Sequence, residues 1–259
     1  MKEKKRPNNP YQLTINQHTL PLRSIARFCH ENQAVKVKLN NKEKFIDLRP
    51  DNPLFCAKRI WDQRAETTIS KDIESSFQNL ADKINSRAIL TLTSEAHSIV
   101  THMYLLWKYK CKLLSHPIND IQLNIIAPER KISAHSQELL EKHGIIHIKS
   151  NGKIPGQAIA GITIQRGLDI ELDLGADRFE WGIINTPKGI EFLVPDASIN
   201  QTIMPISPNI FLIAGLTDCE LSAHDVGIIN RISILESNRY WFARNPNRCL
   251  TLQRCNPWA

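Results

Sequence analysis

Two consecutive helices are predicted by residues 69–115, which read ISKDIESSFQNLADKINSRAILTLTSEAHSIVTHMYLLWKYKCKLLS. In the first half, apolar residues recur at the three- and four-residue spacing of a helix face over 69–86. In the second half, Thr93 can cap a helix that starts at about Ser94 and ends before Pro117. The apolar positions are Ile69, Ile73, Phe77, Leu80 and Ile84 in the first helix, and Ala96, Ile99, Val100, Met103, Trp107 and Leu114 in the second. Two long amphipathic helices joined by a short loop predict an antiparallel pair.

Hairpins are predicted on both sides of the helical pair. Val35–Leu39 and Phe45–Leu48 flank a polar stretch, which is a hairpin signal. Residues 179–185 and 190–194 flank Thr186-Pro187-Lys188-Gly189, where proline and glycine favour a type I turn with its glycine correcting the twist. Further extended segments are expected at 11–15, 121–126, 145–148, 210–216 and 240–242.

Additional helices are expected at 20–31, at 133–143 with Gly144 closing it, and at 225–238. Residues 155–174 favour a helix in their first half, while the alternation in their second half also fits a strand. No repeat or low-complexity linker divides the chain. The expected fold is therefore α+β, with the helical pair packed against antiparallel hairpins in one domain, 11–259, after a disordered basic tail, 1–10.

The composition is that of a folded protein with an excess of positive charge. Of 259 residues, 42% are hydrophobic and 23% charged, and the formal net charge is +7. No apolar run reaches the roughly eighteen residues of a transmembrane helix. The basic residues at the start of the chain are followed by Pro7 and Pro10 and not by the apolar segment of a signal peptide. The six cysteines show no metal-binding spacing. We expect a cytoplasmic protein without membrane contact, and the basic balance favours polyanionic partners such as nucleic acid.

Common catalytic motifs are missing from the sequence. There is no phosphate-binding glycine loop, no H-E-x-x-H and no G-x-S-x-G, which argues against P-loop NTPases, Rossmann dehydrogenases, zincins and ordinary α/β hydrolases. His97 and His102 are five residues apart and point away from each other, so no metal is assigned. The aromatic and lysine residues of 104–112 fit an amphipathic helix better than a nucleic-acid surface, because Trp107 falls on the apolar stripe.

The C-terminal region combines arginines with aromatic residues. Arginine suits bidentate phosphate contact and can also stack on aromatic rings, so this segment is a candidate for nucleic-acid binding. A docked C-terminal segment with its arginines in water is an equally good interpretation. The residues concerned are Arg239, Arg244, Arg248 and Arg254, with Tyr240, Trp241, Phe242 and Trp258.

An ordered series of short motifs resembles the uncharacterised bacterial family DUF four-two-three-eight, a domain of unknown function, over roughly residues 15–245. The family has a His-x-x-Pro…Phe element, a central acidic helix, a strand ending in Thr-Ser-Asp, a Pro-Leu-Ser-Pro turn and a late helix with an asparagine. The matching residues are Gln17-His18-Thr19-Leu20-Pro21 and Phe28, residues 61–66, Ile73-Glu74, residues 181–184, 192–196 and 204–208, Ile229-Asn230, and 240–243. This chain departs from the family at Val194-Pro195-Asp196, which keeps the acid but loses its two hydroxyl neighbours.

The resemblance implies no activity, but it nominates positions for a site. His18 could act as a general acid–base, and Asp196 follows a strand end, where a catalytic carboxylate is common. Glu66 is the third candidate catalytic group, and Glu74 and Asn230 could complete a polar cluster that positions water or a cation against a phosphodiester. Each residue also has a structural alternative: a backbone contact for His18, solvated helix-end acids for Glu66 and Glu74, a turn for Asp196 and a buried amide for Asn230.

The sequence thus leaves several functions open. The leading hypothesis is a nucleic-acid-directed protein that cleaves phosphodiesters with His18, Glu66 and Asp196. The second is a non-catalytic module that binds nucleic acid or an acidic partner through Arg239, Arg244 and Arg248. A plain interaction protein without affinity for polyanions is the third, and the sequence assigns no cofactor and no oligomeric state.

Overall fold

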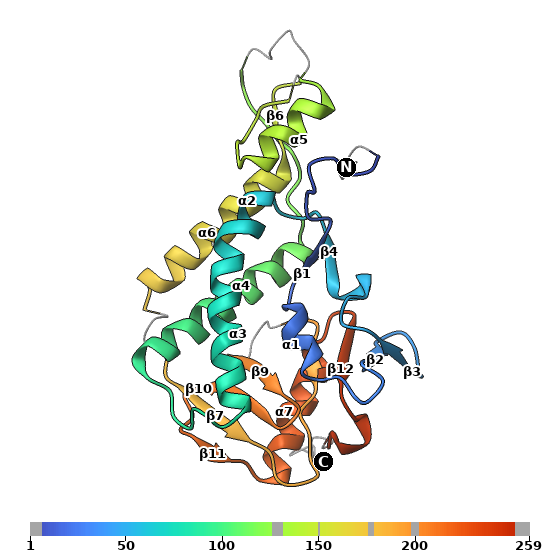
Figure 1. Ribbon diagram of the computed structural model, residues 1–259, viewed down its shortest axis with the longest axis vertical. Coiled ribbons are helices and arrows are strands. Elements are labelled where there is room, and N and C mark those ends of the chain that lie inside the picture. The colour runs from blue at the N-terminus through green and yellow to red at the C-terminus, as the bar shows by residue number, and fades with distance from the viewer. Residues whose placement is uncertain (1–6, 126–131, 150, 176–178, 198–201, 252–259) are drawn as a thin grey trace, which may run out of the picture.

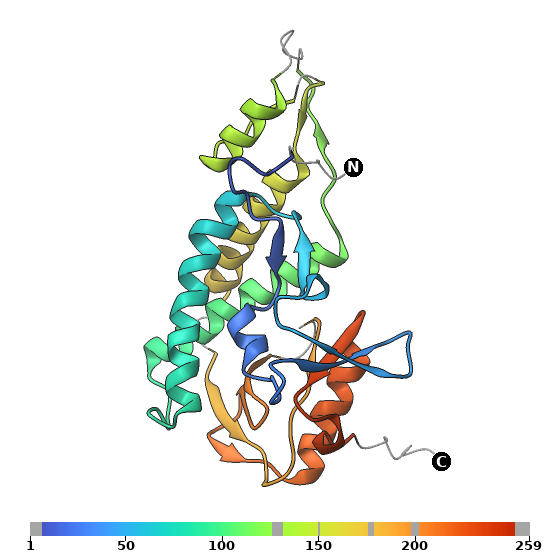
Figure 2. The same ribbon diagram turned by 45° about the vertical axis from the view of Figure 1, so that its right-hand side comes forward.

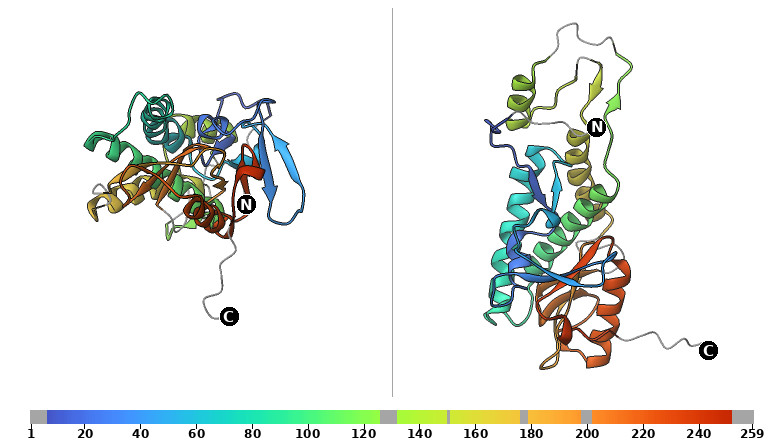
Figure 3. Two further views of the ribbon diagram at one scale, coloured as in Figure 1. Left: turned by 90° about the horizontal axis from the view of Figure 1, so that it is seen from below. Right: turned by 90° about the vertical axis from the view of Figure 1, so that its right-hand side faces the viewer.

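The structure is a computed structural model in which residues 7–125, 132–149, 151–175, 179–197 and 202–251 are described. The molecule is elongated, with α5 (Ala134–Lys142) and β6 (Lys153–Ile154) at one end and two sheets with α7 (Ala223–Glu236) at the other (Figure 1). The long helices α3 (Lys71–Asn85), α4 (Ser94–Ser115) and α6 (Gly156–Asp173) connect the two ends, as Figure 3 shows from the side. The expected α+β fold is confirmed.

The predicted helical pair is present with nearly the predicted bounds. It consists of α3 (Lys71–Asn85) and α4 (Ser94–Ser115), and Thr93 caps α4 by accepting from the Ala96 N–H. A short α2 (Gln63–Ala65) and a π-helical turn (Glu66–Ser70) lead into α3. The ambiguous stretch 155–174 forms the single helix α6 (Gly156–Asp173), which packs on α4. Among the described residues, no helix combines the length and apolar character needed to cross a bilayer.

Two four-stranded sheets lie at the far end of the molecule. One has the order β3 (Phe45–Leu48), β2 (Val35–Leu39), β12 (Tyr240–Ala243), β8 (Val194–Pro195), all antiparallel. The other has the order β11 (Cys219–Glu220), β7 (Trp181–Asn185), β10 (Ile210–Ala214), β9 (Ile203–Ser207). Two-stranded pairs join β1 (Asn16–His18) to β4 (Cys56–Lys58) and β5 (Ile121–Gln122) to β6.

The predicted hairpin of 35–48 is confirmed, but the predicted hairpin of 179–194 is wrong. The chain does reverse here, but the turn spans 187–190, one residue later than predicted: the Ile190 N–H donates to Pro187 O at 3.1 Å, and Gly189, with φ +87°, takes its third position, so it is not the predicted type I turn. However, β7 pairs with β10 and β11, whereas β8 pairs with β12 in the other sheet. The turn residues reverse the chain, but the partner of each strand is decided by distant segments.

Other predicted elements are shorter or absent. The helix expected at 20–31 is reduced to α1 (Leu22–Ala26), because the chain then turns and the His30 N–H donates to Ala34 O. Residues 11–15 and 145–148 form no strand, and β5 covers only the start of 121–126, of which residue 126 lies outside the described residues. Of the expected disordered tail, residues 1–6 lie outside the described residues. Residues 7–10 form turns that Asn9 anchors to the backbone of Leu13.

The core runs through the helices and both sheets. Phe28 lies edge-on to both Phe211 and Phe242, and Phe192 stacks on Phe211 with ring centroids 4.1 Å apart. All four rings are fully buried, and each contributes about 1.5–3 kcal/mol by leaving water. This aromatic cluster fixes β12 between β2 and β8, so it positions the arginines that precede and follow β12.

Candidate functional site

A buried lysine gathers three of the residues that the sequence nominated. Lys110 on α4 has a fully buried side chain, and its Nζ lies 2.7 Å from Glu74 Oε1 and 4.0 Å from Glu66 Oε2. The same Nζ donates to the backbone carbonyl of His18 at 3.3 Å and lies 5.3 Å from the ring centroid of Trp61. We call these five residues the Lys110 centre.

The contacts of the Lys110 centre are those of a structural group. The Trp61 indole N–H donates to Glu66 Oε2 at 2.6 Å, and the His18 imidazole bonds the carbonyl of Pro50 at 3.2 Å through Nε2. A lysine has three N–H donors, and here they face two carboxylates and a carbonyl. Because none of the Lys110 side chain is exposed, this ammonium group cannot reach a substrate in the observed conformation.

Asp196 does not join the Lys110 centre through its carboxylate. Its side chain is buried and accepts from the backbone N–H groups of Asn238, at 2.7 Å, and Arg239, at 3.1 Å. The Arg239 guanidinium donates to the same carboxylate at 3.2 Å. Burial, and next the Asp196 charge, raise the pKa of the neighbouring Tyr240 phenol. Asp196 and Arg239 thus stabilise the turn between α7 and β12.

Asn230 is likewise engaged with the backbone. It is fully buried on α7, accepts from the Leu193 N–H at 3.0 Å and donates to the carbonyls of Glu191, at 2.9 Å, and Leu250, at 3.1 Å. These bonds correspond to the structural alternative given for this residue. They also place Glu191, which no sequence motif indicated.

Glu191 is a buried carboxylate surrounded by arginines. Its side chain is 1% exposed, and Arg244 donates to Oε1 from Nη2 at 2.8 Å and from Nε at 3.2 Å. Arg248 Nη1 lies 3.5 Å from the same oxygen, and the Asn245 N–H donates to Oε2 at 3.2 Å. Arg244 Nη2 also donates to Asn209 Oδ1 at 3.1 Å. The two arginine side chains remain 36% and 54% exposed, so part of each guanidinium faces water.

Two open hollows meet at these arginines. One, of about 1910 Å³, lies between the end of α3, the turn 186–189 and the β7–β11 edge, and the other, of about 1400 Å³, lies beside the β2–β3 hairpin. Arg244 and Arg248 line both hollows. We call the surface formed by residues 244–248 and the two hollows the Arg244–Arg248 face.

Positive side chains outnumber negative ones in the larger hollow. Its lining contains the cations Arg27, Arg87, Lys188, Arg244 and Arg248, against the carboxylates Asp218 and Glu220. Arg27 is paired with Asp82 at 2.7 Å. Arg87 and Lys188 have no carboxylate partner within the described part of the chain, so their charges are available to a ligand. Arg239 is separated from Arg244 by β12, roughly 16 Å of extended chain, so the predicted binding arginines fall into two groups.

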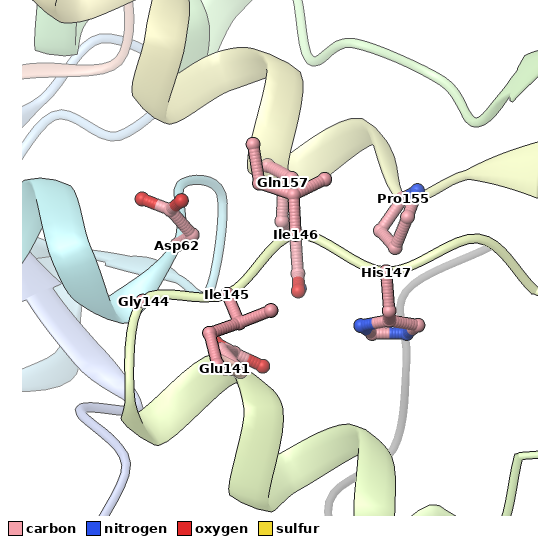
Figure 4. A pocket seen from close by; sticks show the side chains of 9 residues that line it. Asp62, Glu141, Gly144, Ile145, Ile146, His147, Pro155 and Gln157 are labelled. Atoms are coloured by element: carbon pink, nitrogen blue, oxygen red, sulfur yellow. The ribbon is translucent and has the colours of Figure 1, made fainter.

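A smaller pocket of about 330 Å³ lies between α2, α5 and α6, and Figure 4 shows the side chains around it. Burial raises the pKa of Asp62, whose Oδ1 accepts from the Ala65 N–H at 3.0 Å. Glu141 is paired with Arg59, and Gln157 donates to the Arg59 carbonyl at 2.8 Å. The Arg59 contacts tie α5 and α6 to the segment between β4 and α2.

No group of three or more histidine, cysteine, aspartate or glutamate side chains within the described ranges has an arrangement that could hold a metal ion.

In comparisons with known proteins, no family model, curated protein or solved structure matches the chain. The resemblance to DUF four-two-three-eight therefore stays a prediction, and function must be argued from the geometry.

Two residues at the centre of these clusters were missed in the sequence, although each leaves a signal there. Lys110 lies three residues after Trp107 and seven after Met103, which places a lysine on the apolar stripe of α4. Glu191 is the one acid among the apolar residues Ile190, Phe192, Leu193 and Val194. A charge within an apolar pattern predicts a buried ion pair, but its partner comes from a distant part of the chain.

Proposed function

We propose that this protein binds nucleic acid without cleaving it, through the Arg244–Arg248 face. The observation that carries the proposal is the placement of Arg244 and Arg248 on the border of two open hollows, with both guanidinium groups partly exposed. Guanidinium groups bind phosphate oxygens in bidentate fashion, and anchoring at Glu191 reduces the side-chain entropy lost on binding. The formal net charge of +7 adds a long-range attraction for a polyanion.

Binding is better supported than phosphodiester cleavage. The proposed catalytic groups are engaged elsewhere: Glu66 with Trp61 and Lys110, and Asp196 with the backbone of 238–239. A cleaving site would need these groups to converge on one substrate atom. The Arg244–Arg248 face needs no rearrangement, because its cations already lie at the surface.

The test is a binding titration with the full chain. Fluorescence anisotropy with a labelled 20-nucleotide RNA, the same DNA sequence and duplex DNA is measured over a series of salt concentrations. We expect Arg248→Ala to weaken binding and to reduce the slope of log K against log salt by about 0.7–0.9 for each phosphate that the variant no longer neutralises. Arg166→Ala, on the exposed surface of α6, is the matched control and should leave the slope unchanged.

The same samples test the competing functions. Cleavage in Mg²⁺ or Mn²⁺ that EDTA and His18→Ala both abolish would replace the proposal with a nuclease. An equal loss of affinity in Arg248→Ala and Arg166→Ala would show that binding is diffuse and would contradict the proposed face. Absence of salt-dependent binding to all three nucleic acids would overturn the proposal entirely.

A further inference from the structure

The outward face of the β3–β2–β12 sheet carries aromatic rings and lysines side by side. In the register of the sheet, Phe45 pairs with Lys38 and Lys38 with Trp241, so these three side chains form one row on one face. The next row on that face contains Asp47, Lys36 and Ala243. The residues between these rows, such as Val37 and Phe242, point into the core.

Phe45 is the accessible aromatic ring of this face. It is 41% exposed, and it lies edge-on to Trp241, with ring centroids 5.3 Å apart and an interplanar angle of 78°. Trp241 is only 9% exposed, because it packs in a cluster with Leu193, Ala243 and Cys249 and contacts Phe45 at its edge, so Phe45 is the ring that presents apolar surface to water. The hairpin that carries Phe45 projects from the side of the molecule (Figures 2 and 3), so a ligand can approach this surface.

Phe45 lies in the same hollow as the arginines. The 1400 Å³ hollow is lined by Phe45, Lys36, Arg244 and Arg248, together with the amides of Asn245 and Asn247. Lys36 is paired with Asp47 at 2.8 Å, and the carboxylates that line the hollow are Glu31 and the buried Glu191. The exposed parts of Arg244 and Arg248 are therefore the main cations for a phosphate. One hollow therefore offers an apolar ring, guanidinium donors and amide groups within a single surface.

This combination distinguishes single strands from duplexes. In a duplex the base faces are stacked on each other and only phosphates and groove edges are accessible, so an exposed phenyl ring adds little. In a single strand the bases can separate and stack on an aromatic ring while the phosphates contact arginine. The side-chain amide of Asn247, and the N–H groups of the Asn245 amide whose Oδ1 accepts from the Asn247 N–H, suit exposed base edges.

We infer that the ligand of the Arg244–Arg248 face is single-stranded nucleic acid, with one base stacked on Phe45. The inference rests on the proposed function and adds the substrate class. It assigns Phe45 as a binding residue whose role is separate from that of the arginines, since stacking is independent of salt whereas phosphate contact is not.

The test compares variants of Phe45 in the same anisotropy assay. Phe45→Leu keeps an apolar side chain over Trp241 but removes the flat ring, and Phe45→Tyr restores a ring. We expect Phe45→Leu to weaken binding to single strands by about 5- to 100-fold with an unchanged salt slope, and Phe45→Tyr to bind as the wild type does. Leu174→Ala, at a position 81% exposed outside both hollows, is the control for loss of an exposed apolar side chain.

The outcomes separate this inference from the proposed function. If Arg248→Ala weakens binding while Phe45→Leu does not, or if duplex DNA binds as tightly as single strands, the inference fails and the proposed function stands. If no nucleic acid binds, both fail. Tighter binding to single strands that depends on the ring at position 45 supports the inference, and the RNA and DNA arms then show which sugar is preferred.

Discussion

The Lys110 centre and the Arg244–Arg248 face are built from the same kinds of charged groups in opposite arrangements. In the first, a cation is enclosed: the Lys110 ammonium is fully buried, with carboxylates and a carbonyl around it. In the second, an anion is enclosed: the Glu191 carboxylate is buried and two arginines extend from it to the surface. The long side chains therefore end inside the molecule in one case and outside it in the other.

The difference shows which charged cluster keeps hydrogen-bond donors exposed to solvent. An enclosed ammonium uses its donors within the protein, so it contributes to the architecture and leaves little for a ligand. A guanidinium has five N–H donors, and an arginine held at one edge keeps the others for a second acceptor. The family resemblance nominated three residues of the Lys110 centre, whereas the exposed donors are those of Arg244 and Arg248, which the sequence analysis had named as binding candidates on other grounds.

The largest expected effect is the loss of stability in Lys110→Met. This change leaves the Glu66 and Glu74 carboxylates partly buried without their cation, and removal of one partner of a buried pair typically costs about 3–5 kcal/mol. Urea denaturation measures the free energy of unfolding. Lys108→Met on the same helix is the control, with an expected loss of less than about 1 kcal/mol, because Lys108 and Glu171 are both partly exposed. Similar losses in the two variants would refute the enclosed-cation description.

A smaller loss of stability is expected in Arg244→Ala. Glu191 then loses two hydrogen bonds but keeps the Asn245 N–H and the nearby Arg248, so we expect about 1–3 kcal/mol. Thermal and urea unfolding provide the measurement, and Arg248→Ala should cost less than about 1 kcal/mol, because that side chain is more exposed. If Arg248→Ala were as destabilising as Arg244→Ala, Arg248 would be a structural residue. Its guanidinium would then not be available to bind a phosphate.

The smallest expected effect is local opening, which a cysteine in each region can report. Burial and the charges of Glu66 and Asp51 raise the pKa of Cys56 to about 11, and burial and Glu191 raise the pKa of Cys249 to about 12. At pH 8 both thiols should alkylate more slowly than the exposed Cys219, because the thiolate is the reactive form. Timed alkylation followed by peptide mass spectrometry measures each cysteine separately.

The variants should change these labelling rates selectively. Lys110→Met should accelerate Cys56 and leave Cys249 unchanged, and Arg244→Ala should do the reverse. Equal acceleration of both cysteines in either variant would mean that the two regions open as one cooperative unit, which would contradict their treatment as separate clusters.

Local patterns in the sequence were sufficient for the elements whose signals are short-range. The stripe of α4 and its Thr93 cap predicted that helix, and the polar turn between Val35–Leu39 and Phe45–Leu48 predicted the β2–β3 hairpin. In both elements, the interacting residues lie within a few positions of each other along the chain. The spacing of apolar and polar residues is therefore enough to predict them. The α+β class followed from the same local signals.

Outside the β2–β3 hairpin, only the tertiary structure decided which strands pair, and it alone decided which charges meet. The turn 186–189 was predicted, but β7 and β8 enter different sheets, because pairing depends on β10 and β12 from later in the chain. The partners of Lys110 lie far before it in the chain, from His18 to Glu74. The arginines around Glu191 lie more than fifty residues after it. Burial of a charge costs free energy unless a partner arrives from elsewhere, and such long-range contacts leave no periodic pattern in the sequence. The sequence by itself determined the positive charge and the elements with the strongest local signals, such as α4 and the β2–β3 hairpin, and the fold decided where that charge is accessible.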